Sequence, residues 1–495
     1  MSAPIPFDNL LARTVAQAGV PWQAHAAPQP AWLFFNAPLA QQLGLDAALL
    51  GSEQGLQWWS GREPLPGAAP LAQAYAGHQF GGFSPQLGDG RALLLGDFVG
   101  PTGQRWDLAL KGSGPTPFAR RGDGKAALGP VLREALVSEA MAALGIPSTR
   151  VLAALRTGET IRRERPLPGA QLVRVAASHL RVGSFEYFAA RQDHDVLAAL
   201  LAHAIERHDA DLRAITDPAE QALAWLQAVG QRQARLVAQW WAVGFIHGVM
   251  NTDNMAISGE TLDYGPCAFM EAYAPDTHFS AIDSHGRYAY DQQPLIAQWN
   301  LARLAEALLP LITGPEDSAA RRDWAVARAT EVVQGFDAAF GQHWQALGAA
   351  KLGLAADADP ALLTDFLALL QAAQADFTLS FWHLAALVDE PQHPHPLLGT
   401  QSGWQPWQQR WHQAWQAQGA AATQARLRAS NPLYIPRNHL VEAALDQALE
   451  HGSLAAFERL LQRVRQPFGA ASEAPELWRS ATPAEQRGYQ TFCGT

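Results

Sequence analysis

Cysteine is scarce in this sequence, and so are long runs of charge of one sign. The 495 residues include only two cysteines, Cys267 and Cys493. Two thiols are too few for a disulfide scaffold or a zinc ribbon. Lys and Arg number 36 against 46 Asp and Glu, which gives a formal net charge of −10. Because surfaces that bind nucleic acid concentrate positive charge, we expect no nucleic-acid partner.

Long apolar segments are also missing from the sequence. No stretch offers the roughly 18 uncharged apolar residues that a membrane-spanning helix needs, and residues 1–22 lack the basic start and apolar centre of a secretory signal. We therefore expect a cytoplasmic protein with no membrane partner, and we expect a monomer. The hydrophobic share of 48% and the charged share of 17% are typical of a folded chain.

The composition and residue pattern change along the sequence and predict four parts. Residues 1–70 are punctuated by Pro and Trp and form an extension that must pack on the core. Residues 71–185 alternate short β-type runs with Gly-rich turns around one helix, which predicts a small mixed lobe. Residues 186–345 are mostly helical, and residues 346–495 form a C-terminal helical extension. The predicted class is α+β, with a small N-lobe and a larger helical C-lobe.

Two closely spaced glycines begin the first candidate site. In LGDGRALLLGD, residues 87–97, Gly88 and Gly90 flank Asp89 and precede a β-type run. Glycine lets backbone N–H groups approach phosphate oxygens, and Arg91 adds a positive charge beside them. The same pattern also fits a tight hairpin turn without a ligand, so both interpretations stay open at this point.

A lysine in an apolar strand pattern forms the second candidate. Lys111 follows alternating strand residues in LALKGSG, and a lysine there needs an anionic partner. Glu134 lies 23 residues on, in the helical stretch GPVLREALVSEAMAALG. A glycine loop, a strand lysine and a helix glutamate in this order match the nucleotide-gripping lobe of protein kinases. The alternative is a surface lysine and an ordinary helix carboxylate.

The segment FIHGVMNTDNMAISGETLDYG, residues 245–265, carries the third candidate. Asn254 and Asp263 are oxygen ligands of the kind that hold Mg²⁺, and DYG resembles the DFG of kinases. Five residues before Asn254, where a kinase has its catalytic Asp, this chain has Val249. Asp253 is the nearest carboxylate that can accept a proton in its place. A polar turn after a helix is the alternative interpretation.

Further cations have no place in the ordinary kinase set. Arg174 lies on a strand pattern in QLVRVAASHLR, and Arg181 follows seven residues later. Two guanidiniums at this spacing can converge on one anionic group. In RRGDGK, Asp123 and Gly124 predict another tight bend that would tolerate a phosphate. Solvated loop residues are the alternative for this motif.

These motifs resemble the selenoprotein O family of protein adenylyltransferases, once regarded as pseudokinases. The resemblance runs from about residue 70 to the C-terminus. It rests on long strings in the family's order, among them YAGHQFGGFSPQLGDGRALLLGD, DLALKGSGPTPFARRGDGKAALGPVLREALVSEAM, LVRVAASHLRVGSFEYF, HGVMNTDNMAISGETLDYGPCAFME and NPLYIPRNHLVEAAL.

The resemblance implies a kinase-like fold and transfer of AMP from ATP to Ser, Thr or Tyr hydroxyls of proteins, with diphosphate leaving. It implies that ATP binds inverted, with its γ-phosphate buried. Asp253 would accept the proton, Glu134 would orient Lys111, and Asn254 and Asp263 would hold Mg²⁺, with Mn²⁺ as the alternative metal. The nucleotide would be bound by Gly88, Gly90, Arg91, Lys111, Asp123, Gly124, Arg174, Arg181 and Asp263.

The two cysteines gain a role through the same resemblance. Cys267 lies just after DYG, and Cys493 stands third from the end of the sequence, where some family members carry selenocysteine. Our hypothesis is a disulfide that ties the tail to the activation segment and makes activity depend on redox state. Two unconnected thiols are the alternative.

Two other functions compete with adenylyl transfer. The first is a phosphoryl-transferring kinase that uses Asp253 as its base, against which Val249 argues. The second is a nucleotide-binding scaffold without catalysis. A protein that only binds has no need of the complete set of Lys111, Glu134, Asn254 and Asp263.

Overall fold

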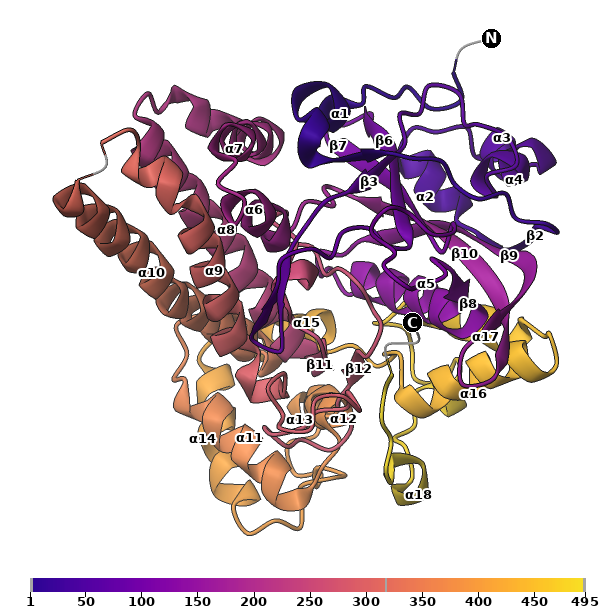
Figure 1. Cartoon of the computed structure of the whole chain (residues 1–495). Helices are drawn as coiled ribbons and strands as arrows, with labels where there is room; N and C mark the ends of the chain where they lie inside the picture. The colour runs from indigo at the N-terminus through magenta and orange to yellow at the C-terminus, as the bar shows by residue number, and fades with distance from the viewer. Residues whose placement is uncertain (1–2, 317, 493–495) are drawn as a thin grey trace.

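The computed structural model describes residues 3–316 and 318–492. It confirms the predicted α+β class and the bilobal kinase-like arrangement. A mixed lobe built on an antiparallel sheet lies beside a helical part, and the last helices return to the mixed lobe (Figure 1).

The main sheet of the mixed lobe runs in the order β1-β3-β6-β7-β10-β9-β2, with β8 pairing on β10. Neighbouring strands of this sheet run antiparallel. The strands are β1 (Gly19–Pro21), β2 (Ala31–Phe35), β3 (Leu71–Gln73), β6 (Ala92–Val99), β7 (Arg105–Lys111), β8 (Ala126–Ala127), β9 (Arg150–Arg162) and β10 (Pro166–Ala176). Two small hairpins stand apart: β4 (Gly77–Gln79) with β5 (Gly82–Ser84), and β11 (Phe245–Ile246) with β12 (Ala268–Phe269).

Residues 1–70 pack on the core and also supply two strands of this sheet. β1 and β2 are its two outermost strands, so both edges come from the segment before residue 71. The same segment forms α1 (Leu10–Thr14), α2 (Ala37–Gln42), α3 (Ala47–Leu50) and α4 (Glu53–Trp59). A covered edge leaves no row of free N–H and C=O groups on the inner strands.

Helix α5 (Leu128–Ala143) packs on the sheet and carries Glu134. Arg133 and Glu134 lie off the stripe of apolar residues that this helix carries in the sequence. Both are buried. Glu134 faces the sheet, where it bonds to Lys111 and Arg174. Arg133 lies on the side of α5 that α16 (Asn438–Glu450) and α17 (Ala455–Val464) cover, and it bonds to Glu442. A sequence pattern shows the polar residues of a helix but not the later segment that buries them.

The helical part is built on α6 (Val182–Ala189), α7 (His194–His208), α8 (Pro218–Val243), α9 (Gln293–Thr313) and α10 (Ala319–Lys351). Helix α8 begins at Asp217, whose carboxylate accepts from the N–H groups of Ala219 and Glu220, and it ends at Gly244 with φ 70°. These are ordinary helix caps. The loop that follows, between β11 and β12, contains Val249, Asp253 and Asp263.

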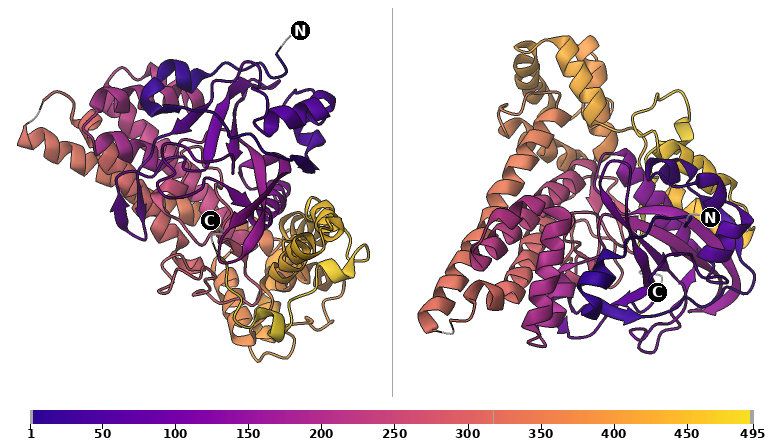
Figure 2. Two further views of the ribbon diagram at one scale, coloured as in Figure 1. Left: turned by 45° about the vertical axis from the view of Figure 1, so that its right-hand side comes forward. Right: turned by 90° about the horizontal axis from the view of Figure 1, so that it is seen from above.

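The remaining helices are α11 (Ala361–Ala373), α12 (Phe377–Trp382), α13 (Leu384–Asp389), α14 (Trp404–Gln416), α15 (Ala420–Ser430) and α18 (Pro483–Gln486). Helix α14 buries four tryptophans at helical spacing, Trp404, Trp407, Trp411 and Trp415, in a core of its own. Figure 2 shows helix α14 beyond the helical lobe and away from the sheet. Among the residues described, no helix is both long and apolar enough to cross a membrane.

Candidate active site

The site residues predicted from the sequence come together in one cleft between the sheet and the β11–β12 loop. The cleft has a volume of about 1060 Å³. Its lining includes Gly88, Gly90, Arg91, Lys111, Asp123, Gly124, Arg174, Arg181, Asp253, Asn254 and Asp263. Glu134 lies behind this lining, bonded to Lys111.

The strand register explains why Lys111 and Arg174 are neighbours. Lys111 of β7 pairs with Leu172 of β10, and Ala109 pairs with Arg174. Residues two apart on a strand share a face, so both cations project from the same side of the sheet. This is the side that α5 covers with Glu134.

Four side chains form an ion network at that point, in which Glu134 and Arg174 are buried and Lys111 and Asp263 are half-buried. Lys111 Nζ lies 2.7 Å from Glu134 Oε2 and 2.7 Å from Asp263 Oδ1. Arg174 Nε donates to Glu134 Oε1 at 2.7 Å. Burial by itself would raise the pKa of Glu134, but Arg174 and Lys111 outweigh it and hold the pKa below its usual value. The network therefore holds Lys111 in place with its ammonium at the cleft.

Asp263 is strained and strongly ionised. Its φ of 69° is in the left-handed region, which non-glycine residues rarely occupy. Burial opposes ionisation of its carboxyl, yet Lys111, Arg174 and Arg91 hold its pKa well below the usual range. A carboxylate kept charged at this depth can bind a cation or a second positive group.

Asp253 has the opposite electrostatic character. Burial raises its pKa to about 6, although Arg181 works against the shift. Its Oδ2 accepts from Gln79 Nε2 at 3.2 Å, while its buried Oδ1 has no hydrogen-bond partner among the described residues. Arg181 Nη1 donates to the backbone carbonyl of Asp253 at 2.9 Å. A carboxylate with a pKa near neutrality and one free oxygen suits proton transfer.

The Asp253 loop is also fastened to the N-lobe hairpin and to α6. The backbone N–H of His78 donates to Thr252 Oγ1 at 2.7 Å, and Thr252 donates to Glu186 Oε2 at 2.6 Å. His78 Nδ1 lies 2.5 Å from Glu186 Oε1. The hairpin packs so closely that a Cβ on Gly77 would lie 2.5 Å from Asp253 Oδ1. These contacts fix the position of Asp253.

A metal at this site would need oxygen ligands from the substrate. Asn254 Nδ2 donates to the carbonyl of Val249 at 3.0 Å, which leaves the amide oxygen as the ligating atom. Within residues 3–316 and 318–492, no three His, Cys, Asp or Glu side chains come together as a metal site. Asn254 and Asp263 alone fit a cation that takes its other ligands from phosphates and water.

The glycine turns are needed for packing between two loops. Gly88 has φ 73°, and a Cβ there would lie 2.2 Å from Cγ of Phe118. Gly124 has φ 66°, and its Cβ would lie 2.2 Å from the carbonyl carbon of Gly114. The sequence predicted close approach to phosphate. The structure shows in addition that the 88–91 turn packs closely against the loop that carries Phe118.

We expect Gly88→Ala to weaken both folding and ATP binding. The left-handed φ costs about 1–2 kcal/mol for a residue with Cβ, and displacement of Phe118 adds to it. Gly103→Ala is the matched control, because Gly103 has φ 82° but no atom within 4 Å of its Cβ position. Urea unfolding and ATP titration measure the two effects. Equal losses of stability in both variants would contradict the packing argument.

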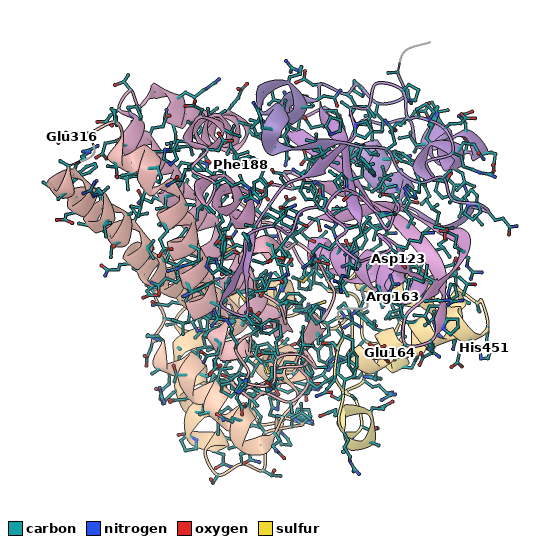
Figure 3. The ribbon with its side chains drawn as sticks, in the orientation of Figure 1. Asp123, Arg163, Glu164, Phe188, Glu316 and His451 are labelled. Carbon is teal, nitrogen blue, oxygen red and sulfur yellow. The ribbon has the colours of Figure 1, made fainter. Side chains whose placement is uncertain are left out.

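Asp123 stabilises the turn in which it lies, through hydrogen bonds to Arg163 and Lys125. Its carboxylate accepts from both Nη atoms of Arg163, at 2.8 and 3.0 Å, and from the backbone N–H of Lys125 at 3.0 Å. Figure 3 shows Asp123 and Arg163 next to each other at the end of the β9–β10 hairpin. The Arg163 guanidinium holds the pKa of Asp123 below its usual value. The bend at Asp123 and Gly124 is thereby fixed at the rim of the cleft.

A second, smaller cavity of about 260 Å³ lies on the far side of the Lys111–Glu134 pair. Its lining includes Glu134, Arg133, Thr491 and Phe492. Arg133 Nη2 donates to the carbonyl of Cys267, and Thr491 Oγ1 donates to the carbonyl of Pro266 at 2.6 Å. The tail therefore runs beside the activation segment.

Cys267 is buried, and burial raises the pKa of its thiol to about 11. Its Sγ contacts the carbonyl oxygen of Tyr264 at 3.5 Å. Cys493 lies outside the described residues. Thr491, two positions before it, is bonded to the residue that precedes Cys267.

Comparison with known proteins decides the family. A family model described as protein adenylyltransferase SelO matches residues 8–465. This chain belongs to the SelO family. It is similar over its whole length to proteins named protein nucleotidyltransferase YdiU. That of Chromobacterium violaceum is 52% identical over 487 residues, which cover 97% of this chain and 100% of the relative. That of Methylorubrum populi is 51% identical over 510 residues, covering 100% of both chains.

The SelO chain described here is therefore an enzyme, a protein nucleotidyltransferase of the adenylyltransferase type, whose substrates are ATP and proteins. Several residues around its cleft were missed by the sequence analysis. Gln79 and Asn251 line the cleft beside Asp253, and Glu186 braces the loop from behind. Nothing in the string SFEYF distinguishes Glu186 from an ordinary helix glutamate. Its contacts with Thr252 and His78 become visible only in the structure.

Proposed function

We propose that this SelO-family enzyme transfers AMP from ATP to Ser, Thr or Tyr hydroxyls of proteins and releases diphosphate. The acceptor oxygen attacks the α-phosphorus, and the bond from that phosphorus to the α–β bridging oxygen breaks. Asp253 accepts the hydroxyl proton. Lys111, Arg174 and Arg181 supply positive charge for the phosphates and for the leaving diphosphate.

The positions of the positive charges in the cleft support an inverted placement of ATP. Lys111 and Arg174 lie deep, bonded to Glu134, and suit the terminal phosphates. Arg181 is bonded to the Asp253 carbonyl, so a phosphate that it contacts lies near the proton acceptor. Gly88, Gly90, Arg91, Asp123 and Gly124 would form the rim that holds the rest of the nucleotide.

We propose Mg²⁺ as the metal, with Mn²⁺ as the alternative. Asn254 and Asp263 would hold it, and Asp263 is ionised for that purpose. When bound, the cation neutralises negative charge on the phosphates.

The observation that carries this proposal is which residue of the cleft can accept a proton. Val249 lines the cleft at the place expected for a kinase base, and it has no proton-accepting group. Asp253 lines the same cleft with a raised pKa and a free Oδ1. A phosphoryl-transferring kinase that uses Asp253 is the second candidate, because the Lys111–Glu134 pair is present in its usual form.

Paired labelling separates these activities. Purified protein receives Mg²⁺ and ATP labelled on the α-phosphate in one sample and on the γ-phosphate in the other, and protein-bound label is counted. We expect label from the α-phosphate only. Label from the γ-phosphate only would make the protein a kinase. If ATP binds but neither label is transferred, the protein is a nucleotide-binding scaffold.

We also propose that Cys267 and Cys493 form a redox pair. Thiol–disulfide exchange with an oxidised disulfide, such as oxidised glutathione, would join the two sulfurs while two electrons and two protons reduce the oxidant. Support comes from the contact between Thr491 and Pro266. Because burial disfavours the Cys267 thiolate, we expect slow formation of the bond unless the tail opens. Non-reducing peptide mass spectrometry that never finds the joined peptides would contradict the pair.

We further propose that the protein acts as a monomer in the cytoplasm. Light scattering on the purified protein tests the oligomeric state, and cell fractionation tests the location.

A further inference from the structure

The cleft is chemically divided between its interior and its mouth. Its interior carries the cations assigned above to ATP. Among the large apolar side chains in the lining, Leu87, Phe118 and Val249 are buried, whereas Phe80 is 39% and Ile282 is 60% exposed. Exposed apolar groups beside a reactive carboxylate are a feature of surfaces that bind another molecule. Apolar side chains offer neither a hydrogen bond nor a positive charge to the phosphates of ATP.

Phe80 is presented by a rigid turn. Phe80 and Gly81, with φ 51° and 85°, are the two central residues of the β4–β5 hairpin, as in a type I′ turn. The Phe80 N–H lies 3.1 Å from Asn251 Oδ1 and 3.2 Å from Tyr288 Oη. The Phe80 ring lies 5.1 Å from the Tyr288 ring. The Phe80 turn is thus held by Asn251, which lies two residues before Asp253 in the sequence.

Ile282 is presented by a loop that is fastened on both sides. The Ala281 N–H donates to the carbonyl of Thr491 at 3.0 Å. The carboxylate of Asp283 accepts from the N–H groups of Arg287 and Tyr288, at 2.9 and 2.8 Å. Tyr288 therefore connects the Ile282 loop to the turn that carries Phe80.

A cation without an acidic partner lies beside the same turn. The Arg287 guanidinium carbon lies 5.0 Å from the Trp299 ring centre and 3.7 Å from the Cβ position of Gly81. Of the carboxylates in the described residues, none forms an ion pair with Arg287. A guanidinium supported by aromatic faces is prepared for a carboxylate from another molecule.

We propose that Phe80, Ile282 and Arg287 form an acceptor lip, the surface that docks the polypeptide to be modified. The occupant is a segment of acceptor protein with a large apolar side chain beside the modified residue and an Asp or Glu nearby. The apolar side chain lies against Phe80 and Ile282, and the carboxylate pairs with Arg287. The acceptor lip rests on the proposed function, since the docked hydroxyl must reach Asp253.

A positional peptide library tests the acceptor lip. The probe is a set of synthetic peptides with one central Ser, Thr or Tyr and one fixed flanking residue in each pool, incubated with α-labelled ATP and the full chain. We expect the wild-type protein to prefer pools with a large apolar residue next to the centre and an acidic residue nearby. Burial of one such side chain is worth about tenfold in kcat/KM.

Phe80→Asn is the decisive variant. Asn before Gly is the favoured pair for a type I′ turn, so this change removes the aromatic ring and preserves the hairpin. We expect Phe80→Asn and Ile282→Ser each to lose the apolar preference, with about a tenfold lower kcat/KM for the best pool and an unchanged KM for ATP. Arg287→Gln should lose only the acidic preference.

Matched controls come from apolar side chains that are exposed outside the cleft. Phe83 on the same hairpin is 44% exposed, and Leu295 is 58% exposed. Phe83→Ser and Leu295→Ser should keep the wild-type preferences. A wild-type protein that labels all pools equally, or a Phe80→Asn variant with intact preference, overturns the acceptor lip and leaves adenylyl transfer standing. A wild-type protein that transfers no α-label contradicts the proposed function and the acceptor lip with it.

Discussion

Replacing Lys111 by methionine should lower the rate of AMP transfer by two to three orders of magnitude. Methionine keeps the length and apolar stem of lysine but removes the charge that lies 2.7 Å from both Glu134 and Asp263. Loss of one preorganised charge or donor at a transition state typically costs about 10²–10³ in kcat. Arg174 remains to partner Glu134, so we expect the variant to fold. Initial rates with α-labelled ATP measure the effect, and thermal unfolding checks the fold.

Lys125→Met is the matched control for this experiment. Lys125 lines the same cleft, but it is paired with Glu159 at the rim. The same substitution there should lower the rate less than tenfold, because the charge of Lys125 is offset by Glu159 and Lys125 forms no bond to Glu134 or Asp263. A Lys111→Met enzyme with more than a third of wild-type activity would remove Lys111 from the proposed phosphate site.

The rate of transfer should fall in acid as Asp253 becomes protonated. A general base acts in its ionised form, and burial raises the pKa of Asp253 to about 6. We therefore expect kcat/KM to rise between pH 5 and pH 7 and then to level off. Asp253→Asn should remove this dependence and lower the rate by about 10²–10⁴.

Asp123→Asn distinguishes Asp253 from other carboxylates of the cleft. Asp123 lines the same cleft, but Arg163 holds its pKa below the usual value, so it stays ionised throughout the pH range. This variant should keep the acid limb of the profile. An acid limb that survives in Asp253→Asn would assign the titration to another group.

That Lys111 needs a carboxylate partner could be predicted from its place in an apolar strand, and the following helix could be predicted to supply it. A lysine at the end of an apolar strand needs a partner, and the structure places Glu134 there. The same helix contains Glu139, which pairs with Arg150 and Arg465. No local pattern separates the two glutamates. Only their positions against the sheet and the later helices do.

The bracing of Asp253 could not be predicted from the sequence. His78, Glu186 and Thr252 meet through contacts that span 66 to 174 residues of chain. Each residue is ordinary in its own segment, so spacing gives no signal. The strained φ of Asp263 was equally hidden, since the DYG string specifies the residue types and not the backbone angle.

The cover of α5 by α16 and α17 has a consequence for how the protein is made. Strands and helices of the mixed lobe leave the ribosome early, but the side of α5 away from the sheet packs against α16 and α17, which are made near the end of synthesis. Domains generally fold as units during synthesis. Here the nascent chain must wait for segments made near the end of translation before α5 is fully packed. An interrupted translation product should therefore leave the outer side of α5 exposed and be less stable.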